Sequence, residues 1–578
     1  MSRAACALVG LLGVADAWSA TASAGTTSAA ATAGSAGGNA FDQLVDDFVF
    51  GTLALSPTNA TAVGYHVHHG VSLDDALDDF SPAGIDASRR LAKDIEARIA
   101  RLDVTSLDAE QRADVDVMQG ALGAKLLELE EIQGYRHNPT TYVELLGNGL
   151  YSHYVLHYAS VTDRYRHIIN RLNAVPELMR EAEANLQDSP AVWNSVARDE
   201  NVGNIDLIDT TLRGECPPGQ RMRYDQAAAA AIAALMGFNH WLEDHLAEKV
   251  SDWRLGKELY AKKFRLVLST GKTPEALLAE AEADLVQARA EIARLAAPRT
   301  VEQALAEVAR EHATVTTYIP SAKTDLAQAT AFVKAKDLLT LPPNSNLEVI
   351  ETPVFMRGIY GVGGFNPAPA LEPKLGAFFW VTPIPSTWPQ TRIDSKLREY
   401  NESGMQHLTV HEAMPGHYVQ AEYANDIQPQ SRRLLRDIYG NTPYVEGWAV
   451  YTQRLMADQG YLADTPGYRL TLQKQLLRVL ANTILDVRLQ TLGMTDNQAL
   501  DLMTRSTYQE TEEATAKLQR VKLSSCQLPA YYAGYKGWLA VREHSEAKHG
   551  AAFNLKAFHE AALKEGAVPL PVLDRLLQ

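Results

Sequence analysis

The chain has 578 residues, of which 46% are hydrophobic and 21% charged, so it can bury a large core and is not an intrinsically disordered polymer. Its 54 Lys and Arg residues against 70 Asp and Glu residues give a net charge of −16, which argues against a nucleic-acid-binding surface. Only three cysteines are present, too few for a disulfide scaffold and not spaced as in a zinc finger. Any metal site must therefore use histidines and carboxylates.

Residues 1–24 are typical of an export signal. Arg3 provides a positive start, an apolar run extends from Ala4 to Val14, and Ala22-Ser23-Ala24 supplies the small residues that a signal peptidase recognises. Asp16 keeps the apolar run shorter than the roughly 20 residues that a membrane span requires. Cys6 lies near the start of the run, which favours a soluble exported protein over a lipoprotein. We therefore expect a periplasmic or secreted protein that has no membrane partner once the signal is cleaved.

Residues 25–40 predict a flexible linker. From Gly25 to Gly38 the chain is almost entirely Ala, Gly, Ser and Thr, which offers nothing to pack. We expect folding to begin near Phe41 and to continue as a helical N-terminal lobe over residues 41–340. Within this lobe, apolar residues at three- and four-residue spacing predict amphipathic helices over Leu91–Leu102, Gln111–Leu129, Arg164–Leu186 and Pro274–Leu295.

The remaining segments complete a mainly α fold with a small β-sheet. The apolar stretch Ala227–Phe238 is too short to span a membrane and suits a buried core helix. Between Leu341 and Pro385, prolines, glycines and aromatics are frequent, and the runs Leu347–Met356 and Ala377–Thr382 predict strands. Helical periodicity returns from Ser395. We assign residues 341–578 to a C-terminal lobe that carries the chemistry.

Two histidines and a glutamate lie within the seven residues from His411 to His417. Neutral imidazoles are good zinc ligands, and a carboxylate beside the metal can accept a proton from water. In the motif His-Glu-x-x-His the histidines share a helix face, but here their separation is six residues, and a straight helix would place them about 120° apart. They can meet only if the helix bends or ends at Pro415 and Gly416. The alternative is that His411 caps or packs a helix and that Pro-Gly is an ordinary turn.

A further carboxylate, Glu446, lies in an apolar and aromatic segment that starts after Pro443 and reads Tyr444-Val445-Glu446-Gly447-Trp448-Ala449-Val450-Tyr451. Zincin sites need a third protein ligand, often a glutamate on a following helix. Burying Glu446 without a counter-charge would cost several kcal/mol and raise its pKa, whereas a divalent cation removes that penalty. The alternative is that Glu446 forms an ion pair with an arginine such as Arg454.

Together, His-Glu-x-x-Pro-Gly-His and Tyr-x-Glu-Gly-Trp-Ala-x-Tyr resemble the bacterial family called domain of unknown function 885. That family is in turn similar to the gluzincin metallopeptidases, including the carboxypeptidase Taq and thimet oligopeptidase families. Further matches to the pattern are Leu397-Arg398-Glu399-Tyr400-Asn401, Gln420, Leu485-Asp486, Arg520, Gln527, Tyr531, Gly534 and Arg542. The chain departs from the pattern at Gln490, where many members have a histidine, and at Ser525, where many have a proline. We therefore leave Gln490 out of the site.

The resemblance implies a zincin-like helical peptidase fold that hydrolyses peptides. In such a site His411, His417 and Glu446 would hold Zn²⁺ and leave one position for water. Glu412 would act as the general base, taking a proton as the peptide carbonyl is attacked and passing it to the leaving amine. Tyr531 would donate a hydrogen bond to the oxyanion, because a phenol can donate without first becoming charged.

The resemblance also suggests how a peptide could be held. Arg520 and Arg542 could bind a substrate carboxylate, which would make the protein a carboxypeptidase or dipeptidase, although surface salt bridges are the simpler explanation of both residues, and the one we slightly favour. If a strand edge near Val349–Met356 flanks the zinc, a substrate peptide could pair with it as an extra strand. The glycine-rich stretch Gly358–Phe365 does not match a phosphate-binding fingerprint.

Three other functions remain open on the sequence. Two histidines and a carboxylate also form the facial triad of non-haem iron oxygenases, but such a triad has no need of an acid–base glutamate such as Glu412. The same zinc, water and base would equally serve a hydrolase of a non-peptide ester or amide. A non-catalytic binding protein could keep the fold. We make no prediction of the oligomeric state.

Overall fold

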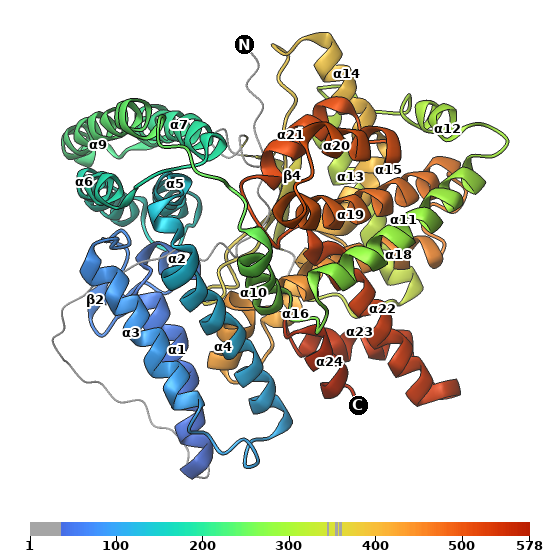
Figure 1. The fold of residues 1–578 in the computed structure, drawn as a ribbon, viewed down its shortest axis with the longest axis horizontal. Helices are drawn as coiled ribbons and strands as arrows, with labels where there is room; N and C mark the ends of the chain where they lie inside the picture. The colour runs from blue at the N-terminus through green and yellow to red at the C-terminus, as the bar shows by residue number, and fades with distance from the viewer. Residues whose placement is uncertain (1–35, 344–345, 353–356, 358–360) are drawn as a thin grey trace.

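The computed structural model describes residues 36–578 except residues 344–345, 353–356 and 358–360. The described chain is mainly helical with two small sheets, as the sequence predicts (Figure 1). The predicted export signal, residues 1–24, lies outside the described residues. Helix α1 begins at Ala36, so the end of the predicted linker 25–40 is helical instead. A helix anchored by buried residues such as Phe41 and Leu44 extends backwards by a turn more easily than a new helix starts.

The first part of the chain forms helices and one short antiparallel hairpin of β1 with β2. In order, the elements are α1 (Ala36–Ala54), α2 (Pro57–Ala62), β1 (Val67–His68), β2 (Val71–Ser72), α3 (Pro82–Ile99), α4 (Ala109–Leu127), α5 (Thr140–Val155), α6 (Val161–Asn185), α7 (Ala191–Asp206), α8 (Arg213–Glu215), α9 (Arg221–Trp241), α10 (Gly256–Leu268), α11 (Pro274–Ala296), α12 (Val301–Val308) and α13 (Tyr318–Lys336). The four predicted amphipathic helices correspond to α3, α4, α6 and α11. None of the described helices is both long and apolar enough to cross a membrane.

Helix α9 contains the apolar stretch Ala227–Phe238 and differs from its prediction. It packs on α6 through one face that includes Ala231 and Leu235, both fully buried. Its other face is open to solvent, and Met236 is 51% exposed. The prediction of a core helix is therefore right for one face and wrong for the other. Alanine occurs on both faces of α9, because burying its small side chain gains little free energy and exposing it costs little.

A three-stranded sheet follows α13, in the order β3-β5-β4. Strand β5 (Ala377–Val381) lies in the centre, parallel to β3 (Leu347–Glu351) and antiparallel to β4 (Gly363–Asn366). Two of the strands confirm the predicted runs, although residues 353–356, at the end of the first run, lie outside the described residues. Strand β4 was not predicted. A Cβ at Gly363 would lie 2.2 Å from the carbonyl oxygen of Trp380, so only glycine fits this close pairing.

The rest of the chain is helical. Its helices are α14 (Gln390–Glu399), α15 (Glu402–Glu412), α16 (His417–Ala424), α17 (Gln430–Ile438), α18 (Thr442–Asp458), α19 (Pro466–Thr491), α20 (Asp496–Asp501), α21 (Thr511–Val521), α22 (Pro529–His549), α23 (Leu555–Lys564) and α24 (Leu570–Leu576). Helices α18 and α22 pack closely against each other, and α19 packs on α11. These helices surround the segment that contains the two histidines.

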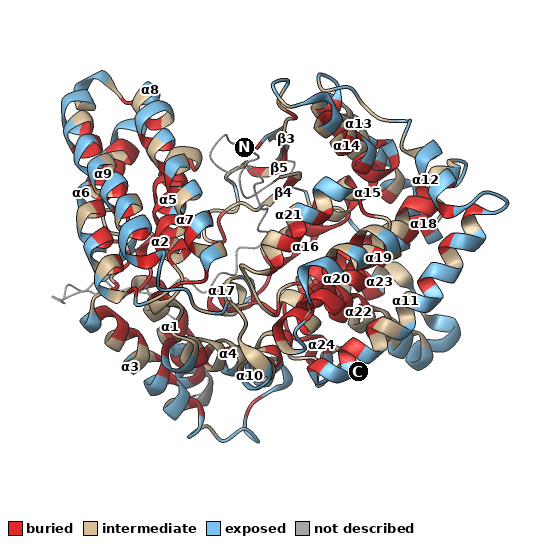
Figure 2. Ribbon diagram, turned by 45° about the horizontal axis from the view of Figure 1, so that its top comes forward, coloured by how far each residue is buried: buried red, intermediate tan, exposed pale blue. Residues whose placement is uncertain are grey.

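The buried apolar residues form two main cores. One lies within α5 to α9, which stand together at one side of the molecule (Figure 2). The larger core joins α1, α3 and α4 to α10–α19, the three-stranded sheet and α22–α24, so it contains residues from both sides of position 340. The first helices of the chain thus pack with the last ones. Cys216 and Cys526 lie buried and are both free.

Candidate metal centre

The segment between His411 and His417 breaks one helix and starts another. Helix α15 ends at Glu412 and α16 begins at His417, so the two histidines lie on different helices. A Cβ at Gly416 would lie 1.9 Å from the backbone oxygen of His411, so the tight turn requires glycine. Pro415 lacks the N–H that a continuing helix would use. The predicted bend is therefore present at Pro-Gly.

The turn brings His417 back beside His411, and α18 adds Glu446. The Nε2 atoms of His411 and His417 lie 3.5 and 3.6 Å from Oε2 of Glu446. One ligand atom from each residue lies within 4.8 Å of the others, and among the described residues this is the one group of three or more such side chains that could hold a metal ion. The three predicted ligands thus face a common point.

These three side chains have the chemistry of a zinc site. Both ring nitrogens of His417 and Oε2 of Glu446 are buried and make no hydrogen bond within the described part of the chain. Burial alone raises the pKa of Glu446, but the adjacent His411 and His417 outweigh this effect and hold the pKa well below its ordinary value. Unpaired buried polar atoms are costly, and coordination of a divalent cation by two imidazoles and a carboxylate would satisfy them. The residues present fit zinc.

Two glycines let α18 carry Glu446 to this position. A Cβ at Gly447 would lie 2.3 Å from the carbonyl carbon of Gly534 on α22, and a Cβ at Gly534 would lie 2.0 Å from the oxygen of Pro443. The two helices therefore cross in backbone contact, directly beside Glu446. On the other side of α18, Nε1 of Trp448 donates hydrogen bonds to the backbone oxygens of Pro415 and Gly416 at 2.9 and 3.2 Å. Residues of the second motif thus fix the turn of the first.

Glu412 lies beside the three ligands but does not join them. Its side chain is 4% exposed, and its Oε2 accepts a hydrogen bond of 3.0 Å from the backbone N–H of Phe365 on β4. Burial raises the pKa of Glu412 to about 7, against the opposing effect of His411. The strand beside the site is therefore β4, and not the edge near Val349–Met356 that the sequence suggested, because β3 lies at the far edge of the sheet.

Tyr531 reaches the same place from α22. Its ring lies parallel to that of His411 with centroids 6.3 Å apart, and its hydroxyl accepts a hydrogen bond of 3.4 Å from Nε2 of Gln527. Burial and the nearby Glu446 raise the pKa of Tyr531, so the phenol keeps its proton at neutral pH. A protonated phenol beside a metal site can donate a hydrogen bond to a developing oxyanion.

A cleft of about 270 Å³ opens beside these residues and is lined by His411, Glu412 and Tyr531. Arg520 also lines the cleft, whereas Arg542 is not among the residues described along it. Arg542 donates to Glu546 one turn further along α22 and to the hydroxyl of Tyr451. The structure therefore brings Arg520 to the cleft but does not bring Arg542 there with it, and Arg542 instead forms an ion pair with Glu546. Eleven residues of helix separate Arg542 from Tyr531, which places it about 16 Å further along the helix axis.

Other residues of the family pattern have structural roles. Asp486 accepts hydrogen bonds from the hydroxyl of Tyr260 at 2.7 Å and from the N–H of Cys526 at 3.2 Å, which fixes the segment before α22. Gln490 bonds the backbone of Leu255 and Ser524, which agrees with leaving it out of the site. Lys517, which was not predicted as a site residue, lines the cleft one turn before Arg520 on α21. The spacing of the two cations was the available signal.

The chain is similar in sequence to one protein family and in fold to solved structures. Residues 57–577 match the family described as "Bacterial protein of unknown function (DUF885)". The fold is similar to that of "a putative lipoprotein of unknown function" from Shewanella oneidensis, with 27% identity, a TM-score of 0.77, and coverage of 93% of this chain and 99% of that chain. It is also similar to "the putative lipoprotein" from Colwellia psychrerythraea, with 17% identity, a TM-score of 0.77, and coverage of 94% and 98%. No curated protein matches the chain. Because the family match spans most of the sequence, this chain belongs to the bacterial DUF885 family.

Proposed function

We propose that this protein is a zinc-dependent peptidase. The observation that carries the proposal is the convergence of His411, His417 and Glu446, whose ligand atoms lie within 4.8 Å of one another. A buried carboxylate, Glu412, and a buried phenol, Tyr531, lie beside this group on the wall of one cleft. Packing alone does not explain why several buried polar side chains with unpaired atoms lie together at this site. The arrangement is that of a hydrolase that activates water.

Each side chain has a defined task in peptide hydrolysis. Bound by the three ligands, zinc would polarise the scissile carbonyl and lower the pKa of a water molecule. Glu412 takes a proton from that water and later delivers it to the leaving amine. The backbone N–H of Phe365 donates a hydrogen bond to one carboxylate oxygen of Glu412, and the other oxygen would take part in this proton transfer. Tyr531 donates its hydroxyl proton in a hydrogen bond to the oxyanion.

The edge strand β4 favours peptides over other amides or esters. The backbone oxygen of Val362 accepts a hydrogen bond from Thr382 at the end of β5, so the backbone groups of Gly363 point away from β5. Gly363 also lines the cleft. An extended peptide can therefore pair with β4, with its carbonyl groups aligned along the cleft. A non-peptide ester or amide would make no use of this edge.

We also propose that the protein acts outside the cytoplasm, in the periplasm or as a secreted protein. The support is the signal-like composition of residues 1–24. The two similar structures are both described as lipoproteins, which are exported proteins. In this chain Cys6 lies before most of the apolar run, so we favour cleavage without lipid attachment.

Digestion of a mixed peptide library tests the proposed activity. We expect the zinc-loaded protein to cleave peptide bonds, a metal chelator to abolish cleavage, and added zinc to restore it, as read by mass spectrometry. Parallel assays with simple esters and acyl amides are the control for reaction class. Turnover of the esters without cleavage of any peptide would replace the peptidase with the alternative hydrolase. Cleavage that persists after complete removal of metal would contradict both.

A further inference from the structure

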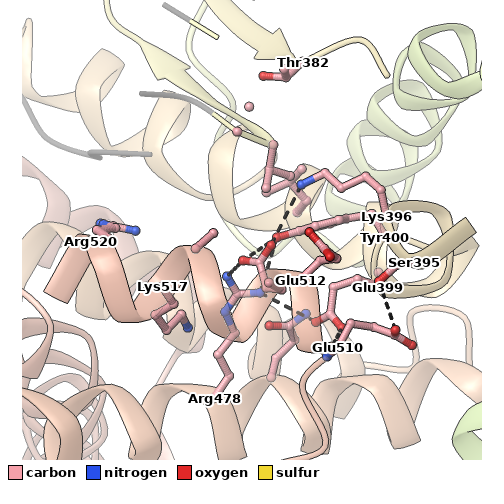
Figure 3. A pocket seen from close by; sticks show the side chains of 18 of the residues that line it. Thr382, Ser395, Lys396, Glu399, Tyr400, Arg478, Glu510, Glu512, Lys517 and Arg520 are labelled. Carbon is pink, nitrogen blue, oxygen red and sulfur yellow. Dashed lines mark hydrogen bonds and ion pairs between the residues drawn. The ribbon is translucent and has the colours of Figure 1, made fainter. Parts of the chain in front are cut away.

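The cleft beside the metal centre continues into a cluster of partly buried ion pairs, of which Figure 3 shows Arg478, Lys396 and Glu399. Arg478 lies 2.5 Å from Glu513, and Lys474 lies 2.8 Å from Glu399. Lys396 contributes a weaker contact with Glu513 at 3.9 Å. The carboxylates of Glu513 and Glu399 therefore already lie within ion-pair distance of other cationic side chains.

Two cations on α21 stand beside this cluster without an anionic partner. Lys517 is only 5% exposed, and its Nζ donates to the neutral Oδ1 of Asn482 at 3.0 Å. Arg520 donates to the neutral Oε1 of Gln527 at 3.3 Å, while its Nε is buried and unpaired. Within the described chain, neither side chain forms an ion pair with a carboxylate. Burial, together with the positive charges of Arg478 and Arg520, lowers the pKa of Lys517 against the opposing effect of Glu513 and Glu399.

These two cations face the same cleft as the metal centre. Lys517 and Arg520 both line it, together with His411, Glu412 and Tyr531. They lie three residues apart on α21, with a rise of about 4.5 Å between them, and Figure 3 shows both on that helix. Gln527 links Arg520 to the hydroxyl of Tyr531 through hydrogen bonds of 3.3 and 3.4 Å. The two cations therefore lie along the cleft that contains the proposed catalytic residues, and Arg520 is linked to one of them, Tyr531.

We propose that Lys517 and Arg520 bind a carboxylate of the peptide substrate, an inference that rests on the proposed peptidase function. A guanidinium donates two hydrogen bonds in the plane of a carboxylate, and an ammonium adds a third donor and a second charge. The carboxylate belongs either to the C-terminus of the peptide or to an acidic side chain. In the first case the enzyme releases short products from the C-terminus. Lys517 takes the place in this site that the sequence suggested for Arg542.

Peptide binding to the zinc-loaded Glu412→Gln variant tests the inference without turnover. The probes are acetyl-Ala-Ala-Phe-Ala-Ala with a free C-terminus, the same peptide as its C-terminal amide, and the amide with one alanine after the phenylalanine replaced by glutamate. We expect one of the two carboxylate-bearing peptides to bind roughly 10- to 100-fold more tightly than the uncharged amide, because hydrogen bonds between charged groups are strong. Which peptide binds more tightly identifies the source of the carboxylate.

Substitution of the two cations should remove this preference. In the same background, Lys517→Met and Arg520→Gln are expected to weaken binding of the preferred peptide to the level of the amide and to leave the amide unchanged. Arg520→Lys should keep part of the preference. Lys522→Met is the matched control, because Lys522 follows α21, pairs with Asp496 at 2.6 Å and lies outside the cleft lining.

A second readout separates ligand binding from a structural role. Because Lys517 is a buried cation without a carboxylate partner, Lys517→Met should keep or raise the melting temperature.

Equal affinity for the three peptides, no binding of any of them, or an equal loss for acid and amide in the variants would overturn the inference. Cleavage of the peptide library by the protein that keeps Glu412 reports separately on the proposed function. Hydrolysis without carboxylate preference contradicts only the carboxylate subsite, whereas preference without hydrolysis contradicts only the peptidase.

Discussion

Glu412→Gln is expected to reduce the rate of peptide hydrolysis by about 10²- to 10⁴-fold, the range that general acid–base catalysis contributes. The amide of glutamine has the shape of the carboxylate and its oxygen can still accept the hydrogen bond from Phe365, but it cannot take a proton from water. The substitution also removes a buried negative charge, so the melting temperature should not fall. Steady-state hydrolysis and thermal denaturation of the same preparation check the two parts, and its zinc content shows that the metal is still bound.

The control for this prediction is Glu412→Asp, which keeps a carboxylate on a side chain that is one methylene shorter. It should retain more activity than the glutamine variant and bind the same amount of zinc, because Glu412 does not belong to the three ligands. Full activity of Glu412→Gln would remove Glu412 from the role of general base. Loss of zinc in Glu412→Gln would show instead that Glu412 supports the metal site.

Gly447→Ala is expected to destabilise the fold by about 1–3 kcal/mol, the usual cost of adding a methyl group to a fully packed contact. The new Cβ would lie 2.3 Å from the backbone of Gly534, and backbone atoms cannot rotate away as a side chain can. Helices α18 and α22 would have to separate, which moves Glu446 on the first and Tyr531 on the second. We therefore expect zinc affinity and activity to fall together with stability.

Gly237→Ala is the matched control for this substitution. Gly237 lies inside helix α9, and a Cβ there would meet no other atom within 4 Å. Alanine has the higher helix propensity, so this variant should be as stable as the natural protein or more stable by about 0.5–1 kcal/mol. Denaturation curves of both variants and their zinc affinities provide the comparison. Unchanged stability and zinc affinity in Gly447→Ala would contradict the close crossing of α18 and α22.

Local sequence signals were sufficient for the helices and for the turn between the two histidines. Periodic apolar residues mark α3, α4, α6 and α11, because each of these helices buries one face. The separation of His411 from His417 required a break at Pro415 and Gly416, and the end of α15 and start of α16 lie there. In both cases the residues that determine the feature lie within a few positions of it in the sequence. Such features can be predicted without knowledge of the tertiary structure.

Features that depend on distant contacts were not predicted. Strand β4 contains two glycines and has little strand propensity, and it forms because β5 pairs with it at a distance that only glycine permits. Arg542 shares a helix with Tyr531, yet the direction of α22 carries it away from the cleft. The spacing of Lys517 and Arg520 is visible in the sequence, but only the structure shows that both line the cleft and that Lys517 donates to a neutral amide. Each of these depends on which segments meet in space.

The central claim is that His411, His417 and Glu446 together hold one divalent cation. X-ray absorption spectroscopy at the zinc edge, combined with elemental analysis of the purified protein, tests it most directly. We predict one zinc ion per chain with two nitrogen ligands at about 2.0–2.1 Å and the remaining ligands oxygen, and loss of the ion in His417→Ala. A protein that retains no divalent metal, or whose zinc coordination is unchanged by His417→Ala, would contradict the account.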